Sequence, residues 1–257
     1  MELSKRLHAV ANLVSAGLTV ADVGTDHGYI PIYLLENRIC ANNSNFNLSR
    51  IIKLILNLLQ NRICAKAFAM DVNKGPLLRA KEHIAEHGLE EMIETRLSDG
   101  VKQLQVGECD AVVIAGMGGA LTVKILDEGK EVFKNLTEFV LQPQSELYKV
   151  REYLFEQGYC VVAEDMVQEE GKFYPMMKVI NGESDTYNTI EFRYGKLLLS
   201  KKHPVLKIYL EKEKNTKKMI LQNLQKESGE HIEVRIKEIE EELEGIKYAL
   251  QRYYEGD

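Results

Sequence analysis

The rhythm of hydrophobic and polar positions divides the chain into two parts. Up to residue 182, short β-rich runs alternate with helical patterns. Strands are expected at residues 18–23, 66–72, 110–115, 139–142, 159–167 and 173–180, and helices at 3–17, 77–87 and 146–157. Short apolar strands separated by helices are typical of a parallel, doubly wound α/β sheet. The last two strands are joined by a turn around Gly171, so we expect a hairpin with one antiparallel strand.

The remaining part has a purely helical pattern. Its last segment repeats apolar residues at alternating spacings of four and three, as in a coiled-coil seam: Ile232, Ile236, Ile239, Leu243, Ile246, Leu250 and Tyr253. Pro204 opens an earlier helix that runs to about residue 226, and Ser228-Gly229 separates the two. We therefore expect a first domain over residues 1–182 and an antiparallel helical hairpin within a second domain over 183–257.

A short sequence duplication interrupts the first domain. The residues NRICA at 37–41 recur at 61–65, offset by 24 positions. Two copies are too few for a solenoid. We interpret residues 42–65 as a local insertion with a duplicated flank, whose apolar residues between 51 and 59 could form a peripheral helix.

Charge is distributed unevenly in a chain of 257 residues with a formal net charge of -6. Residues 187–226 hold ten lysine and arginine residues against three acidic ones, whereas residues 227–257 hold four against ten. The first of these segments could be an ordinary solvated helix face or a surface for an anionic partner such as nucleic acid.

Other bulk features exclude several classes of protein. No apolar run approaches the roughly 20 residues that a membrane span needs, and the first residues do not resemble a secretion signal. The four cysteines at 40, 64, 109 and 160 form neither a CxxC pair nor a metal-like cluster with histidine. We expect a reduced, cytoplasmic setting, no metal, no membrane association, and a monomer whose helical seam pairs within the chain.

The strongest local motif follows the first expected strand and reads DVGTDHGY, residues 22–29. Glycine at such a turn lets the backbone approach a ligand closely. The dinucleotide fingerprint GxGxxG is absent, and Asp26 would repel a diphosphate. Carboxylates here instead suit a ligand with a cationic amino-acid end, such as S-adenosylmethionine. The motif favours a methyltransferase over a dehydrogenase.

Three later segments complete the expected site. Asp71 ends the second strand 47 residues after Gly24; without the 24-residue insertion the interval is 23, close to the roughly 20 expected for a ribose-binding carboxylate. Asp99, in the loop Ser98-Asp99-Gly100, could accept from an adenine amino group. The turn at 115–119, AGMGG, closes the next strand beside the reacting centre. Taken alone, Asp71 could be a turn residue or a helix cap, and the glycine turn a simple connection.

Together these segments resemble a known family. LSKRL, ADVGTDHGYIPIYL, MDVNKGPL, RLSDG, IAGMGG, LQPQ and EGKFYP are similar to motifs of the bacterial tRNA (adenine(22)-N1)-methyltransferase family, the TrmK family. The resemblance implies a Rossmann-like class I methyltransferase fold with a C-terminal helical, coiled-coil-like domain that helps to hold tRNA. The segment 42–65 departs from the family pattern.

The resemblance also assigns residues. It places the methionine end of S-adenosylmethionine on the 22–29 turn, its ribose on Asp71 and its adenine on Asp99. Expected cofactor-binding residues are Asp22, Gly24, Thr25, Asp26, His27, Gly28, Tyr29, Asp71, Asp99, Gly100, Ala115, Gly116, Met117, Gly118 and Gly119. The resemblance also gives Lys5 and Arg6 as a basic pair near the cleft. The lysine-rich segment adds Lys201, Lys202, Lys207, Lys214, Lys217 and Lys218 as expected tRNA-binding residues. Asp26 is the candidate catalytic residue, because N1 methylation of adenine creates a cation that a carboxylate would stabilise.

Two alternatives stay open at this point. A methyltransferase acting on a small molecule or on another RNA shares the cofactor motifs, although a small molecule would not require the lysine-rich segment. A non-enzymatic RNA-binding protein, inactivated by the insertion, is also compatible with the sequence. The site of methylation rests on the family resemblance alone.

Overall fold

The computed structural model describes residues 3–37, 66–226 and 229–255. The expected insertion at 42–65 and its peripheral helix lie outside the described residues, as do Cys40 and Cys64. Within the described parts, no helix is long and apolar enough to span a membrane.

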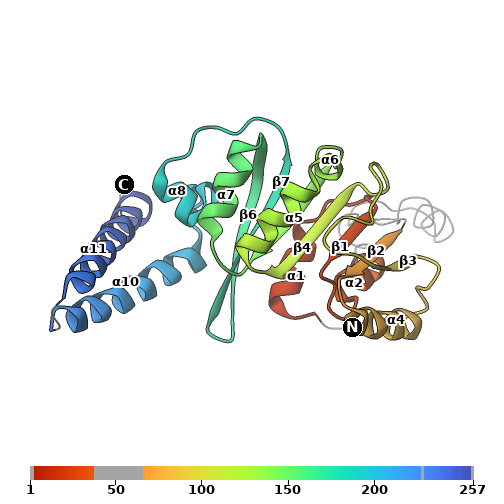
Figure 1. Ribbon diagram of the computed structural model, residues 1–257, viewed down its shortest axis with the longest axis horizontal. Coiled ribbons are helices and arrows are strands. Elements are labelled where there is room, and N and C mark those ends of the chain that lie inside the picture. Colours follow the sequence, from red (N-terminus) through yellow and green to blue (C-terminus); the bar gives the residue numbers. More distant parts are fainter. Residues whose placement is uncertain (1–2, 38–65, 227–228, 256–257) are drawn as a thin grey trace, which may run out of the picture.

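A seven-stranded sheet forms the centre of the molecule (Figure 1), in the order β3-β2-β1-β4-β5-β7-β6. The strands are β1 (Val20–Val23), β2 (Ala67–Asp71), β3 (Ile93–Leu97), β4 (Ala111–Met117), β5 (Glu138–Pro143), β6 (Tyr159–Glu169) and β7 (Lys172–Asn181). β1 to β5 pair in parallel, while β7 is antiparallel to both β5 and β6. The predicted doubly wound sheet with a terminal hairpin is confirmed.

Helices cover both faces of this sheet. They are α1 (Lys5–Leu13), α2 (Tyr29–Asn37), α4 (Lys74–Glu86), α5 (Gly119–Glu128), α6 (Lys130–Phe133) and α7 (Leu147–Glu156). Side chains alternate between the faces of a strand. In β4, Val112 and Ile114 therefore belong to a core with α5, α6 and α7, whereas Ala111 and Val113 belong to a core with α1, α2 and α4. Burial on both faces explains the continuous apolar run at this strand.

The sequence pattern missed part of this layer. β3 was not predicted, because its sequence IETRL lies at the sheet edge, buried only at Ile93, and has no apolar run. α5 was also missed, since it begins within the glycine turn that the motif emphasised. The first helix ends at Leu13 and not near Gly17, because Val14 already has an extended conformation.

The C-terminal part is helical: its first two short helices pack against α7 and β6, and the two long helices that follow extend away from the sheet (Figure 1). In chain order, these helices are α8 (Thr189–Tyr194), α9 (Lys196–Ser200), α10 (Pro204–Leu224) and α11 (Glu230–Leu250), which is followed by a π-helical turn at Gln251–Glu255. α10 and α11 pack side by side as a hairpin, as predicted. Five seam residues of α11 are buried, namely Ile232, Ile239, Leu243, Ile246 and Leu250.

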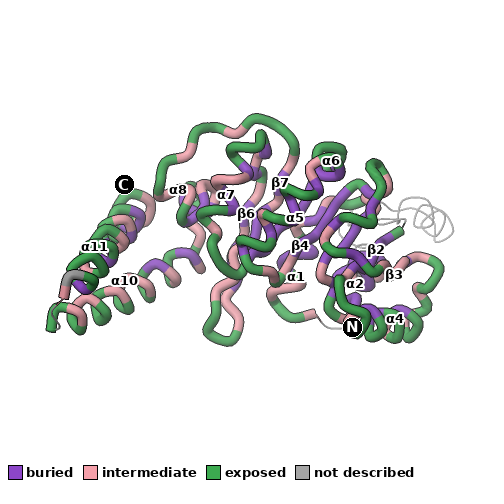
Figure 2. Tube along the Cα trace, viewed as in Figure 1, coloured by how far each residue is buried: buried purple, intermediate pink, exposed green. Residues whose placement is uncertain are grey.

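The root of this hairpin is anchored to the sheet. Met166 of β6 joins a separate apolar cluster with Leu198, Leu206 and the C-terminal end of α11. Burial decreases along α10 away from this root (Figure 2), where buried residues give way to exposed ones. The division of the chain at residue 182/183 stays a prediction.

Candidate functional site

The carboxyl ends of the parallel strands bring the predicted segments together. Val23 of β1 lies opposite Met70 of β2 and Ile114 of β4. The residues that follow, including Gly24, Asp71 and Ala115, therefore lie at one edge of the sheet. The strand order reverses between β1 and β4, and open α/β sheets bind ligands at such a point.

Glycines shape the turn between β1 and α2. Gly24 has a φ of 78°, and the N–H groups of Gly24 and Thr25 both donate to the carbonyl of Met70 at 2.8 Å. Gly28 has a φ of 71° and lies against Ala80 of α4, where an added Cβ would come within 3.3 Å of the Ala80 Cβ. The positive φ values and the close approach to α4 explain why glycine occupies these two positions.

Asp22 supplies a buried carboxyl group directly beneath this turn. Asp22 as a whole is only 4% exposed. Burial is the main reason that the pKa of Asp22 is raised to about 7, and the negative charge of nearby Asp71 adds to the effect of burial; the Thr25 side chain and the guanidinium of Arg6 act in the opposite direction. A cationic ligand bound beside this carboxyl group would stabilise its ionised form, and the attraction would favour binding.

Asp26 lies at the exposed end of the same turn. Its Oδ1 is 3.2 Å from His27 Nε2 and 3.4 Å from Arg79 Nη2, and its side chain is 74% exposed. The His27 ring stacks on Tyr29 and on His83, with 5.2 Å between centroids in each pair. Arg79 and His83 come from α4 and were not predicted as site residues, because nothing in the helix pattern distinguishes them.

The two remaining carboxylates occupy neighbouring loops. Asp71 Oδ1 accepts the N–H of Asn73 at 2.7 Å, so the predicted turn role is real and leaves Oδ2 for a ligand. The N–H of buried Ser98 donates to the carbonyl of Asp71 at 2.9 Å and ties the two loops together. Asp99 is exposed, and its ion pair with Lys102 lowers the pKa of Asp99.

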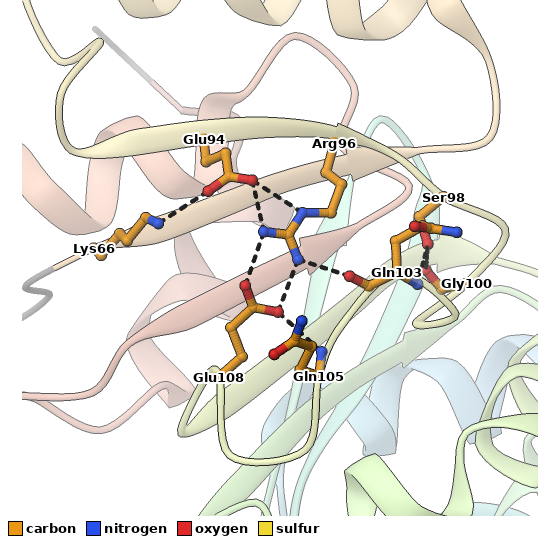
Figure 3. A network of polar contacts seen from close by, with 8 residues as sticks. All are labelled: Lys66, Glu94, Arg96, Ser98, Gly100, Gln103, Gln105 and Glu108. Carbon is orange, nitrogen blue, oxygen red and sulfur yellow. Dashed lines mark hydrogen bonds and ion pairs between the residues drawn. The ribbon is translucent and has the colours of Figure 1, made fainter.

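A polar network braces the Ser98–Gly100 loop (Figure 3). Arg96 of β3 makes paired contacts with Glu94 and Glu108 and donates to the carbonyl of Gln103 at 2.7 Å. Its hydrogen bonds lower the pKa of Glu108 to about 2, so the network persists at neutral pH. The same loop is closed by Ser98, whose hydroxyl donates to the carbonyl of Gly100 at 2.8 Å.

The glycine turn at the end of β4 contacts the turn after β1. A Cβ on Gly24 would lie 2.2 Å from the Cε of Met117, which places Met117 directly over the first turn. Gly116 has a φ of 83° and lies within a bulge between Ala115 and Met117. Gly118 precedes α5, and Gly119 packs so closely on the Ser145 carbonyl that a Cβ would approach it to 2.4 Å.

Arg6 joins the N-terminal helix to this turn. Its Nη1 donates to Gln142 Oε1 at 2.9 Å, and the N–H of Gly116 donates to the same oxygen at 3.2 Å. The guanidinium also lies 5.6 Å from the centroid of the Tyr174 ring. Lys5 is directed elsewhere, since its Nζ donates to the carbonyl of Gln168 at 3.2 Å. Gln142 is fully buried and was not predicted as a site residue.

Four of the predicted RNA-binding lysines, Lys207, Lys214, Lys217 and Lys218, lie on α10 of the helical hairpin. Lys207, Lys214 and Lys218 recur at spacings of seven and four, which places them on one face of α10. Lys217 instead faces α11 and forms an ion pair with Glu242. Lys201 and Lys202 are exposed in the turn before α10.

The chemistry of the site follows from its carboxyl groups. Three carboxylates, from Asp22, Asp71 and Asp99, follow one another along the sheet edge beside two glycine turns, an arrangement that suits a cationic ligand with hydroxyl and amino groups. Within the described residues, no group of three or more histidine, cysteine or acidic side chains could hold a metal ion.

Comparisons with known proteins agree with this geometry. The family model described as tRNA (adenine(22)-N(1))-methyltransferase matches residues 53–248. The Bacillus subtilis protein of that description is 30% identical over 97% of this chain and 98% of its own. The crystal structure of B. subtilis TrmK has a TM-score of 0.79 at 28% identity, covering 97% of this chain and 99% of that one.

A further solved structure carries a cofactor product. M. capricolum TrmK, in complex with S-adenosylhomocysteine, matches with a TM-score of 0.76 at 26% identity over 97% of this chain and 98% of that one. The match therefore extends across the sheet, the carboxyl-edge turns and the helical hairpin. The chain belongs to the tRNA (adenine(22)-N(1))-methyltransferase family.

Proposed function

We propose that this protein transfers a methyl group from S-adenosylmethionine to N1 of an adenine in tRNA, at position 22 by analogy with its relatives. The observation that carries the proposal is the contact between the turn after β1 and the glycine turn after β4, where Met117 lies over Gly24. A methyl donor held by the first turn would face an acceptor at the second.

The residues present fit S-adenosylmethionine. The buried carboxyl of Asp22 suits the ammonium of the methionine end, Oδ2 of Asp71 suits the ribose hydroxyls, and Asp99 suits the adenine amino group. Thr25, His27 and Tyr29 would complete the wall of the first turn, while Gly100 and Ala115 would flank the cofactor. S-adenosylhomocysteine occupies the M. capricolum relative, which supports the same cofactor here.

Catalysis by this chain is mainly positioning and charge stabilisation. The bound cofactor supplies an activated methyl group on a sulfonium. N1 of neutral adenine already has a free lone pair, so no residue must remove a proton before attack. Asp26 is exposed at the mouth of the turn, where its carboxylate could orient the base and stabilise the positive charge that develops on it. Its contacts with Arg79 and His27 hold it there.

The second part of the molecule would bind the RNA. A row of lysines on α10 supports contact with phosphates, and such binding weakens steeply with salt. N1 of a paired or stacked adenine is inaccessible, so the base must leave its stack to react. A small-molecule methyltransferase would have no need for this surface.

The test is methyl transfer from labelled S-adenosylmethionine to unmodified bacterial tRNA, followed by nucleoside analysis. N1-methyladenosine is the expected product, and sequencing of the modified tRNA locates its position. Cofactor binding without any methylated adenine would overturn the proposed substrate. RNA binding without cofactor binding would instead identify a non-enzymatic RNA-binding protein.

A further inference from the structure

A cleft of about 450 Å³ lies between the sheet and the C-terminal helices. Its walls come from the start of α7, the turn of the β6–β7 hairpin, α8 and the first half of α10. Buried Leu198 and Leu206 form part of its floor. The β6–β7 hairpin contributes residues 171–175, which belong to the EGKFYP motif.

The charge of this cleft is opposite to that of the chain. Its lining includes four arginine and lysine residues and, among the described residues, no aspartate or glutamate, although the whole chain has a net charge of -6. Arg151 is engaged in a buried ion pair with Glu164. Lys172 and Arg193 are exposed and line the cleft from the hairpin and from α8, respectively. The cleft therefore favours an anion.

Aromatic side chains give the same cleft flat apolar surfaces. Phe173 and Tyr209 meet edge to face with 5.3 Å between ring centroids, and Lys212 Nζ lies 5.3 Å from the centroid of Phe173. Tyr174 also lines the cleft and is half-buried. Proteins that bind single-stranded nucleic acids combine aromatic rings with cationic side chains, because bases stack on the rings and phosphates pair with the cations.

The cleft lies beside the glycine turn that follows β4. Gln144 lines one end, and its N–H donates to the carbonyl of Met117 at 2.8 Å. From the same end, Tyr174 contacts Arg6, which donates to Gln142 beside the Gly116 turn. A strand whose target base lies at the glycine turn would thus pass directly into the cleft.

We propose that this cleft binds a nucleotide adjacent to the target adenine, with its base against Tyr174, Phe173 or Tyr209 and its phosphate between Lys172 and Arg193. The proposal rests on the proposed function and deepens it by assigning a second nucleotide site to the same reaction. The cleft holds the neighbouring nucleotide outside the RNA stack, and so keeps the target base exposed for transfer.

Charge reversal tests the phosphate contact. The double variant Lys172→Glu/Arg193→Glu should raise the KM for tRNA at least roughly tenfold and lower the salt dependence of binding, while the KM for S-adenosylmethionine stays unchanged. Lys130→Glu/Lys134→Glu, which changes the charge equally on α6 and the turn after it, is the matched control and should leave tRNA binding and its salt dependence unaltered. Unchanged tRNA binding in the double variant would overturn the phosphate assignment.

Crosslinking tests the base contact without any substitution that could unfold the protein. We would place 4-thiouridine on either side of the adenine that the wild-type enzyme methylates, irradiate the complex and map the crosslinked peptides. Crosslinks to residues 172–175 or to Tyr209 are expected. Crosslinks found only elsewhere, with methylation intact, would overturn this inference and leave the proposed function standing; absence of methylation by the wild-type enzyme would instead refute the function itself.

Discussion

Arg151 of α7 and Glu164 of β6 form an ion pair of 2.9 Å in which each side chain is only 1% exposed. The pair also holds the chain that leads into the C-terminal helices. Arg151 donates to the carbonyls of Phe192 and Arg193, and Glu164 accepts the N–H groups of Leu197 and Leu198. The buried charges are thus compensated by each other and by the backbone of α8 and α9, which fixes the root of the hairpin.

We expect Glu164→Ala to destabilise the protein by about 3–5 kcal/mol, because it leaves the Arg151 charge buried without a partner. Urea unfolding followed by circular dichroism measures the change. Arg151→Met/Glu164→Leu should be less destabilising than the single variant. Arg235→Ala, which removes an exposed ion pair with Glu238, should have no measurable effect. A single variant as stable as wild type would mean that the pair does not hold this junction.

Cofactor binding should depend on pH through Asp22. Its pKa of about 7 lies above the ordinary 3.8. Between these two pH values the folded protein keeps the Asp22 proton, whereas the unfolded chain has lost it. Stability should therefore fall as pH rises from about 4 to about 7 and level off above. A cationic ligand favours the ionised form, so S-adenosylmethionine should bind more tightly as pH rises through 7 and should release a proton on binding.

Calorimetry in buffers of different ionisation enthalpy measures this proton release. Asp22→Asn should bind the cofactor more weakly at pH 7 and should lose the rise in affinity that Asp22 ionisation gives below about pH 7. An unaltered pH profile in this variant would assign the titration to another group.

Asp26→Ala should lower kcat by roughly a hundredfold or more, the scale observed when one group that stabilises transition-state charge is removed. Binding of tRNA should be nearly intact, because Asp26 carries no positive charge for phosphates. Asp26→Asn keeps the shape and tests the charge. Turnover equal to wild type in the alanine variant would remove Asp26 from the mechanism.

Arg96→Met should raise the KM for S-adenosylmethionine with little effect on the KM for tRNA. The substitution leaves Glu94 and Glu108 facing each other and frees the Gln103 carbonyl, so the Ser98–Gly100 loop loses its brace. The KM of Arg96→Lys for S-adenosylmethionine should lie between those of the wild type and Arg96→Met, because lysine keeps the charge but cannot make both paired contacts. If both KM values rise equally, the network supports the whole fold instead of this loop.

The sequence predicted the site through its main-chain requirements. Gly24, Gly28 and Gly116 occupy turns with positive φ, and such turns are visible as glycine spacing. The end of the second strand at Asp71 was also predictable from the apolar run before it. These features depend on neighbouring residues, and local patterns report them well.

Contacts made across the fold could not be predicted in this way. Arg79 reaches Asp26 from α4, and Arg6 reaches Gln142 across 136 positions of the chain. In the sequence these residues look like ordinary polar surface residues. They come into contact with their partners only when the sheet forms. For the same reason Lys217 was grouped with the RNA-binding lysines although it pairs with Glu242.

The two helices of the hairpin should contribute unequally to tRNA binding. Lys207→Glu/Lys214→Glu/Lys218→Glu should weaken tRNA binding and lower its salt slope by roughly 2 to 3, since each phosphate contact contributes about 0.7–0.9. Filter binding at several salt concentrations gives the slope. Arg235→Glu/Lys237→Glu/Lys247→Glu changes the charge equally on the acidic α11 and should have a smaller effect. Weaker binding by the α10 variant than by the α11 variant would mean that the phosphates lie along α10. If both triple variants bind equally weakly, net charge alone governs binding, and weaker binding by the α11 variant would contradict the prediction.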